Sequence, residues 1–244
     1  MSFVIWFLKR DVLFSRRSLF FLFMVSGLFP LMMGWHAFNQ TLSTNERNSI
    51  PISHFATDFW MLCAMTLLCG LFIVSMNVQT EKANGSFRAL LALPLSCEQL
   101  FWSRILSAAL WAATPLTFGY ISFWLIQWLG FFGDDALIVL ISRFKFFTLL
   151  LAIDLLLAVL FVGVSLLGDA RFVLVLLVVS LLTPTALNHI VLNRMITGLS
   201  EWSVMPVVIE VMSRTSYLGF LIVTIALLVG FAMSVIFKHK KSYL

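Results

Sequence analysis

Long apolar runs separated by short polar segments dominate the chain. A helix needs roughly 20 apolar residues to cross about 30 Å of hydrocarbon. Six segments reach or approach that length, and we predict that they are membrane-spanning helices: 19–38, 55–78, 100–128, 144–167, 172–187 and 217–237. The predicted fold class is therefore an all-α integral membrane protein with six transmembrane helices.

Residues 1–18 follow a different pattern, in which polar and apolar positions alternate with a helical period. In a heptad arrangement the polar side chains occupy three adjacent phases: Ser2, Lys9, Arg10, Asp11, Arg16, Arg17 and Ser18. Apolar side chains occupy the other phases: Ile5, Trp6, Phe7, Leu8, Val12, Leu13 and Phe14. We predict an amphipathic helix in the headgroup plane, with Lys9, Arg10, Arg16 and Arg17 on its basic side. The alternative is a polar extension of the first span.

The connecting segments differ in polarity. A polar loop is expected at 39–54, and the most polar inner segment, a cytoplasmic coupling loop, at 79–99. Segment 188–216 mixes apolar and charged residues, which favours short helices lying against the membrane over a seventh span. The chain ends in a basic cytoplasmic tail, residues 238–244.

Composition supports a membrane location. The 244 residues are 61% hydrophobic and only 11% charged, and their mean hydropathy is +1.02. Soluble domains carry about 25% charged residues. Water does not solvate such a surface, and six spans leave no length for a second soluble domain.

Charge predicts topology rather than nucleic-acid binding. The net charge is +5, but the sixteen Lys and Arg residues lie at the borders of apolar runs. Short cytoplasmic loops are enriched in these residues. With both termini inside, eleven of the sixteen lie on the inner side and five outside. An even number of spans with both ends in the cytoplasm is therefore predicted, and no nucleic-acid partner.

No catalytic or metal-binding motif occurs in the sequence. It lacks the P-loop pattern G-x-x-x-x-G-K-[ST], the zinc motif H-E-x-x-H and the nucleophile motif G-x-S-x-G. The three cysteines show no disulfide framework or metal-ligand spacing. We therefore predict no enzyme activity in the chain itself, no cofactor and no metal.

The inner segment 79–99 is the most informative part. Asn84-Gly85 is a helix breaker, and a short helical pattern from Ser86 to Leu93 follows before Pro94 ends it. We predict a short amphipathic helix, capped by Ser86, that lies across the cytoplasmic ends of the spans and offers a surface to a soluble partner. The alternative is an ordinary connector whose leucines bury against the bundle.

The stretch EKANGSFRALLALPLS, residues 81–96, resembles the signature E-x-x-x-G-[ST]-x-x-x-L-L-x-x-P-[IL]-[ST] of ABC type-2 exporter permeases. The order of elements is also similar: a basic interfacial helix, two spans, this loop and four more spans. Within that family the chain is most similar to the small permease of the haem-exporter system for cytochrome c maturation. The similarity lies in these segments: Arg10-Asp11 with Arg16-Arg17, FPLMMG at 29–34, NGSFRALLALPLS and TPL at 114–116.

The resemblance implies a mechanism and partners. Two permeases, the chain with itself or with a paralogue, pair in the bacterial inner membrane, and a homodimer of separate ABC ATPase subunits docks under the loop at 79–99. A further membrane subunit is also implied. The residues implied in coupling to the ATPase are Glu81, Gly85, Ser86, Leu90, Leu91 and Pro94.

Asp154 lies near the middle of the fourth predicted span. An ionised carboxylate there costs at least about 2.5 kcal/mol, so it faces a partner, faces water or stays protonated. One interpretation is a substrate-path or subunit-interface residue. The other is a packing hydrogen bond with a neighbour such as Thr114 or Ser165.

The leading functional hypothesis is the transmembrane subunit of an ABC exporter, with haem as the substrate implied by the resemblance. The alternative is a membrane scaffold or assembly subunit that recruits a soluble partner without moving a substrate. An intramembrane enzyme is the weakest hypothesis, because no nucleophile and base, or set of metal ligands, falls at matching depths.

Overall fold

The computed structural model describes residues 3–44, 52–92, 96–128, 144–180, 182 and 215–241. Over these residues the chain is helical and contains no strand, which confirms the all-α prediction for this part. The helices are α1 (Phe3–Thr44), α2 (Ile52–Ala83), α3 (Ser86–Leu91), α4 (Cys97–Trp128), α6 (Phe144–Leu167) and α9 (Thr215–Lys241), with a shorter apolar helix at Ala170–Ser180.

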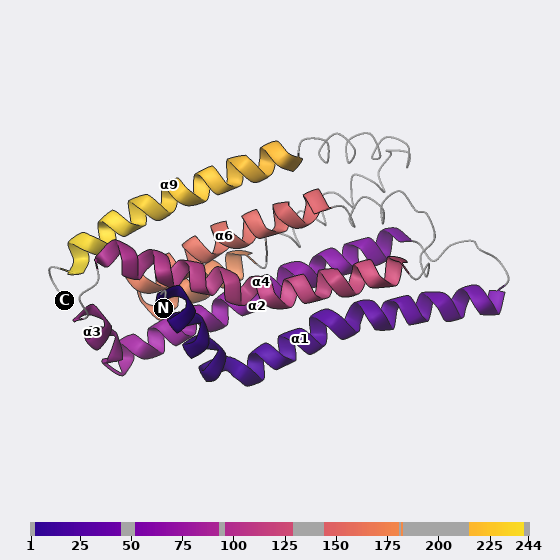
Figure 1. Cartoon of the computed structure of the whole chain (residues 1–244), viewed down its shortest axis with the longest axis horizontal. Coiled ribbons are helices and arrows are strands. Elements are labelled where there is room, and N and C mark those ends of the chain that lie inside the picture. Colours follow the sequence, from indigo (N-terminus) through magenta and orange to yellow (C-terminus); the bar gives the residue numbers. More distant parts are fainter. Residues whose placement is uncertain are drawn as a thin grey trace.

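The five long helices of the described ranges, α1, α2, α4, α6 and α9, run along one common axis, and the short α3 lies at one end of the bundle near the C-terminal end of α9 (Figure 1). Helix α4 packs most extensively against α1, and α6 packs most extensively against α9. Helix α2 contacts α1, α4 and α6, and α4 also contacts α6 and α9. Helix α4 therefore lies at the centre of the bundle.

Among the residues that the structure describes, three segments are long and apolar enough to cross a membrane: Cys97–Ser122 of α4, Phe147–Leu167 of α6 and Tyr217–His239 of α9. The chain therefore has the character of a helical membrane protein. Helices α1 and α2 cover the predicted first and second spans, 19–38 and 55–78, and extend beyond them. The total of six spans stays a prediction.

Several boundaries differ from the sequence prediction. Helix α1 continues to Thr44 and α2 begins at Ile52, so both ends of the predicted polar loop 39–54 are helical. Helix α6 has the predicted bounds of the fourth span. Helix α4 continues through Pro115, which is buried. The region 183–214, with Pro184, lies outside the described residues.

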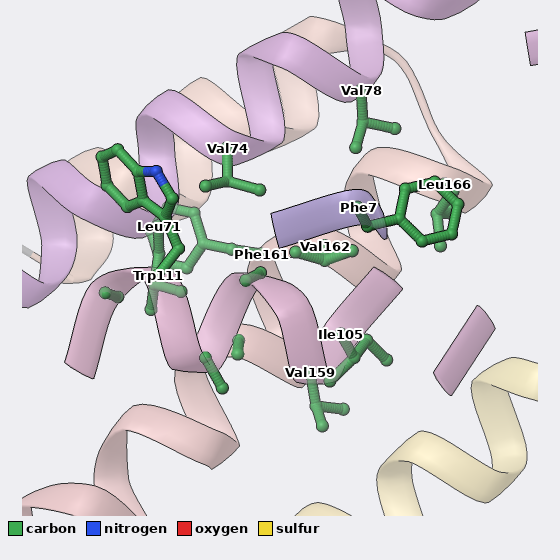
Figure 2. Packing of buried hydrophobic residues seen from close by; sticks show 14 of the residues in the cluster. Phe7, Leu71, Val74, Val78, Ile105, Trp111, Val159, Phe161, Val162 and Leu166 are labelled. Atoms are coloured by element: carbon green, nitrogen blue, oxygen red, sulfur yellow. The ribbon is translucent and has the colours of Figure 1, made fainter. Parts of the chain in front are cut away.

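The core lies between α2, α4 and α6, with Phe7 of α1 at one edge (Figure 2). It contains large side chains that are almost completely buried, including Trp111 and Phe161. Helix α9 lies at the periphery: few of the residues in its spanning segment are buried, whereas more than half of those in the spanning segment of α4 are. Its outer side is a surface suited to lipid, because it exposes Phe220, Leu228 and Phe231.

The N-terminal segment of α1, residues Phe3–Phe14, is separated from the rest of the helix by a kink. Ser15 has non-helical backbone angles, φ −114° and ψ 22°. Its hydroxyl accepts a hydrogen bond from Asn77 Nδ2 of α2 at 2.9 Å. Phe7, Asp11 and Ser15 share the buried side of this segment. The predicted division into a polar and an apolar face is therefore wrong at Phe7 and Asp11, which face the bundle together.

Candidate functional site

Four charged residues meet where α1, α2 and α4 approach one another. Arg104 Nη1 of α4 donates to both carboxylate oxygens of Asp11, at 3.0 and 2.9 Å. Its Nη2 donates to Glu81 Oε1 in the last turn of α2, at 2.9 Å. Arg10 forms an ion pair with the same Glu81 oxygen. We call Arg10, Asp11, Glu81 and Arg104 the charge cluster.

The charge cluster is buried and electrically balanced. The side chain of Asp11 is 0% exposed, that of Arg104 3%, and those of Glu81 and Arg10 are 11% and 16% exposed. Both guanidinium groups also lie over the ring of Phe7, at 4.8 and 5.0 Å from its centroid. Two cations and two anions compensate one another. Loss of one member leaves an uncompensated buried charge, which costs about 3–5 kcal/mol.

Burial affects the protonation of the cluster. It raises the pKa of the Asp11 carboxyl above its ordinary value, although Arg104 and Arg10 act in the opposite direction. Burial likewise raises the pKa of Glu81 and lowers the pKa of Arg10. The desolvation of these groups therefore outweighs their mutual attraction, as is common for buried ion pairs.

The last turn of α2 also holds the end of α6. Lys82 Nζ donates to the carbonyl oxygens of Ser165 and Gly168, both at 2.8 Å. Gln79 Nε2 donates to the Ser165 carbonyl at 2.9 Å. The last carbonyls of a helix lack partners within it, and a cation there also interacts favourably with the helix dipole. Gln79 and Lys82 therefore cap α6 from α2.

The turn before α3 depends on Gly85. Its φ of 73° lies in the left-handed region, which glycine adopts without strain. The residue at the helix N-cap is Gly85, and no side chain caps α3. The predicted cap by Ser86 is therefore wrong: its hydroxyl donates instead to the carbonyl of Glu81, at 3.2 Å, at the end of α2.

Helix α3 has a buried side and an exposed side. Phe87 and Leu90 are buried and Leu91 is half-buried, whereas Arg88 and Ala89 are exposed. The helix ends at Leu91 rather than at the predicted 93, and the segment 93–95, including Pro94, lies outside the described residues. One side of α3 thus packs on the bundle while the other remains available to a partner.

An aromatic contact joins α3 to two long helices. The ring centroids of Phe87 and Phe237 of α9 are 6.4 Å apart, with the ring planes at 65°. Phe237 in turn lies 6.0 Å from Phe101 of α4. Phe237 is 1% exposed. The C-terminal end of α9 is therefore packed against both α3 and α4.

The residues selected from the sequence differ in how they are exposed in the structure. Glu81 belongs to the charge cluster and does not face solvent, whereas Gly85 and Ser86 are exposed at the turn. The basic residues predicted for the interfacial helix, 1–18, divide as well. Arg10 turns into the cluster, and the others remain exposed: Lys9, Arg16 and Arg17. The coupling and interfacial roles themselves stay predictions.

Asp154 is buried in α6, with 2% of its surface exposed. Its Oδ1 has no hydrogen-bond partner among the residues that the structure describes. The hydroxyl of Thr114 donates to the carbonyl of Leu110, and that of Ser165 donates to the carbonyl of Ser75. Neither hydroxyl therefore donates to Asp154, and its functional role stays a prediction.

Sequence reasoning did not select Arg104, Gln79, Lys82 or Phe237. A signal was present for Arg104, because it is an arginine a few residues inside a predicted span, at the same membrane end as an acidic residue of the N-terminal segment. Charges at such a position require partners. Among the described residues, no group of three or more His, Cys, Asp or Glu side chains is placed to hold a metal ion.

Neither a protein-family model nor a curated protein matches the sequence. The functional interpretation therefore depends on the residues of the chain and their geometry.

Proposed function

We propose that the chain is the transmembrane permease subunit of an ABC exporter, which moves a substrate with ATP hydrolysed by a separate subunit. One observation carries the proposal. The α2–α3 corner, residues 79–91, is attached to each of the other long helices in the described part of the chain: Glu81 to α1 and α4, Gln79 and Lys82 to α6, and Phe87 to α9.

Such attachment suits the transmission of a displacement. Helix α3 is a short packed element, and its inner contacts are made by buried side chains. Packed elements transmit motion where a flexible loop does not. A soluble ATPase that docks on the exposed side of α3, at Arg88 and Ala89, would move the ends of four long helices together.

The remaining parts of the proposal follow from the family resemblance. The chain acts in the bacterial inner membrane with six spans and both termini in the cytoplasm. It pairs with a second copy or a paralogue, over a homodimer of ATPase subunits. Haem for cytochrome c maturation is the proposed substrate.

The docking step is tested by co-purification of the ATPase encoded nearest to this chain. Arg88→Glu reverses the charge on the exposed side of α3 and should reduce the amount of ATPase retained at least tenfold. Arg171→Glu is the matched control, because Arg171 is also exposed but lies on a different helix. Equal retention by both variants would refute docking at α3.

Coupling is tested separately from docking. Phe87→Ala removes the contact with α9 but leaves Arg88 in place. We expect the variant to retain the ATPase and to lose the stimulation of ATP hydrolysis by substrate. A scaffold predicts a different result, in which the wild-type complex binds the partner but no substrate stimulates hydrolysis. A native complex that contains no ATPase would contradict the exporter proposal.

A further inference from the structure

Three serine side chains lie completely inside the bundle, where α2, α4 and α6 meet. Ser75 of α2, Ser107 of α4 and Ser165 of α6 are each 0% exposed. The Ser165 hydroxyl donates to the carbonyl of Ser75 at 2.8 Å, which places these two residues at the same depth.

The packing of α4 on α2 places Ser107 at that depth as well. A Cβ added to Gly70 of α2 would lie 3.2 Å from a ring atom of Trp111, so these two residues face each other. Ser75 lies five positions after Gly70, and Ser107 lies four positions before Trp111. Because α2 and α4 run in opposite directions (Figure 1), both steps lead about 6–8 Å toward the end of the bundle that carries α3. We call Ser75, Ser107 and Ser165 the serine layer.

Two polar atoms at this layer have no hydrogen-bond partner among the described residues: the hydroxyl oxygen of Ser75 and Nε1 of Trp111. Trp111 is 1% exposed. Figure 2 shows its indole beside Leu71, with the ring nitrogen on the side toward Val74, the residue before Ser75. Buried polar groups nearly always bond to protein or to ordered water, because burial without a partner is costly. A ligand that bonds to both atoms would remove this cost.

The hydrogen-bonding groups at this place match water. The indole N–H is a donor only, whereas the Ser75 hydroxyl both donates and accepts. The Ser107 hydroxyl already donates to the carbonyl of Arg104 at 2.9 Å and keeps lone pairs that accept. A water molecule that accepts from Trp111 and donates to Ser75 and Ser107 has the number of hydrogen bonds typical of buried water, about three. An apolar molecule would satisfy neither atom.

Polar contacts connect the serine layer to the α2–α3 corner. Gln79 Nε2 donates to the hydroxyl of Ser165 at 3.2 Å, and Gln79 lies one turn after Ser75 along α2. Gln79 is itself half-buried, so it joins the accessible end of the bundle to the buried layer. Water therefore has a polar route into the core from the end that carries α3.

We propose that the serine layer and Trp111 form an internal hydration site, which holds ordered water between α2, α4 and α6. The water bridges Trp111 Nε1 and the Ser75 hydroxyl, and so links neighbouring helices inside an otherwise apolar core. This inference concerns the helical bundle alone and involves neither an ATPase nor a substrate. It therefore stands or fails independently of the exporter proposal.

The test is hydroxyl-radical footprinting of the full chain in detergent, with the modification of each residue measured by mass spectrometry. Radicals formed from bound water label a buried side chain beside it, whereas a dry buried side chain stays unlabelled. Trp111 should be labelled although it is 1% exposed. Phe101 is the internal reference, because it is 0% exposed and packs against the rings of Trp102 and Phe237. It should stay unlabelled after correction for the intrinsic reactivity of the two residue types.

Two serine variants test the assignment of the site. Ser75→Ala should lower the labelling of Trp111 about fivefold, the factor that corresponds to loss of one hydrogen bond to the water. Ser234→Ala is the matched control and should leave this labelling unchanged, because Ser234 is a buried serine of α9 whose hydroxyl donates to the carbonyl of Phe231. Melting of each variant verifies that it folds.

Three results would overturn the proposal. In the first, Trp111 of the wild-type chain is labelled no more than Phe101. In the second, Ser75→Ala leaves the labelling of Trp111 at the wild-type level, and in the third, both serine variants lower it equally. The first comparison needs no variant, so it decides the question even if Ser75→Ala does not fold.

Discussion

Removal of Arg104 tests whether the charge cluster holds the helices together. In Arg104→Met an apolar stem is kept, but the guanidinium over Phe7 is lost, and the Asp11 carboxylate, which is 0% exposed, loses both of its hydrogen bonds. Glu81 keeps only Arg10. Breaking a buried ion pair from one side costs about 3–5 kcal/mol. For a domain of this size that corresponds to a fall in melting temperature of about 6–20 °C.

The assay is thermal melting of the purified chain, followed by size-exclusion chromatography with tryptophan fluorescence. Glu98→Gln is the control, because it removes an ion pair whose partners are exposed. Lys238 Nζ lies 3.8 Å from Glu98 Oε1, and the two side chains are 66% and 56% exposed. Pairs of this kind contribute about 0–1 kcal/mol. The control should therefore melt within about 4 °C of the wild type.

A double variant distinguishes loss of a partner from loss of packing. Asp11→Leu/Arg104→Met replaces both charges by apolar side chains, and such replacements of a buried pair are often close to neutral. It should recover most of the stability that Arg104→Met loses. The reasoning is refuted if Arg104→Met melts like Glu98→Gln, or if the double variant is less stable than Arg104→Met.

Three further predictions concern protonation and packing. Burial raises the pKa of the Asp11 carboxyl above its ordinary value of about 4, so the contribution of this carboxyl to stability is present below about pH 4 and is lost as the pH rises through the raised pKa. Arg104 acts against this rise, so its removal matters most where Asp11 is ionised. The melting penalty of Arg104→Met should therefore shrink as the pH falls from 7 to 5. Lys82→Met removes two hydrogen bonds from the end of α6 and should cost about 1–3 kcal/mol, with faster amide hydrogen exchange at residues 168–172. A Cβ at Gly230 would overlap the indole ring of Trp102 in α4, so Gly230→Ala should lower the melting temperature. A Cβ at Gly219 would meet no atom within 4 Å, so Gly219→Ala should not lower it.

The local features of the fold were predictable from sequence. The bounds of α6 coincide with the predicted fourth span, because its residues are almost all apolar and polar residues precede and follow it in the sequence. The break at Asn84-Gly85 was also predictable, because the turn needs a residue that tolerates positive φ. Features of this kind depend on consecutive residues and on the length of apolar runs.

The partners of individual side chains were not predictable in the same way. The predicted faces of the N-terminal segment placed Asp11 with the exposed basic residues, because a helical period treats every charge as polar. In the structure, Arg104 offers two hydrogen bonds to Asp11 from 93 positions away, which makes burial of the carboxylate tolerable. The hydroxyl of Ser86 likewise donates a hydrogen bond to a carbonyl of the preceding helix, α2, and does not cap the backbone amides of α3.

The sequence by itself determined that the chain is helical and apolar enough for a membrane, and it located the polar corner after α2. Both results depend on local properties, the length of the apolar runs and the position of helix-breaking residues. Only the tertiary structure decided how that corner is attached. One turn of α2 carries Gln79, Glu81 and Lys82, whose side chains form hydrogen bonds and ion pairs with different helices. Their partners belong to α1, α4 and α6. Such pairing depends on how distant helices pack, and no periodicity in a single helix encodes it.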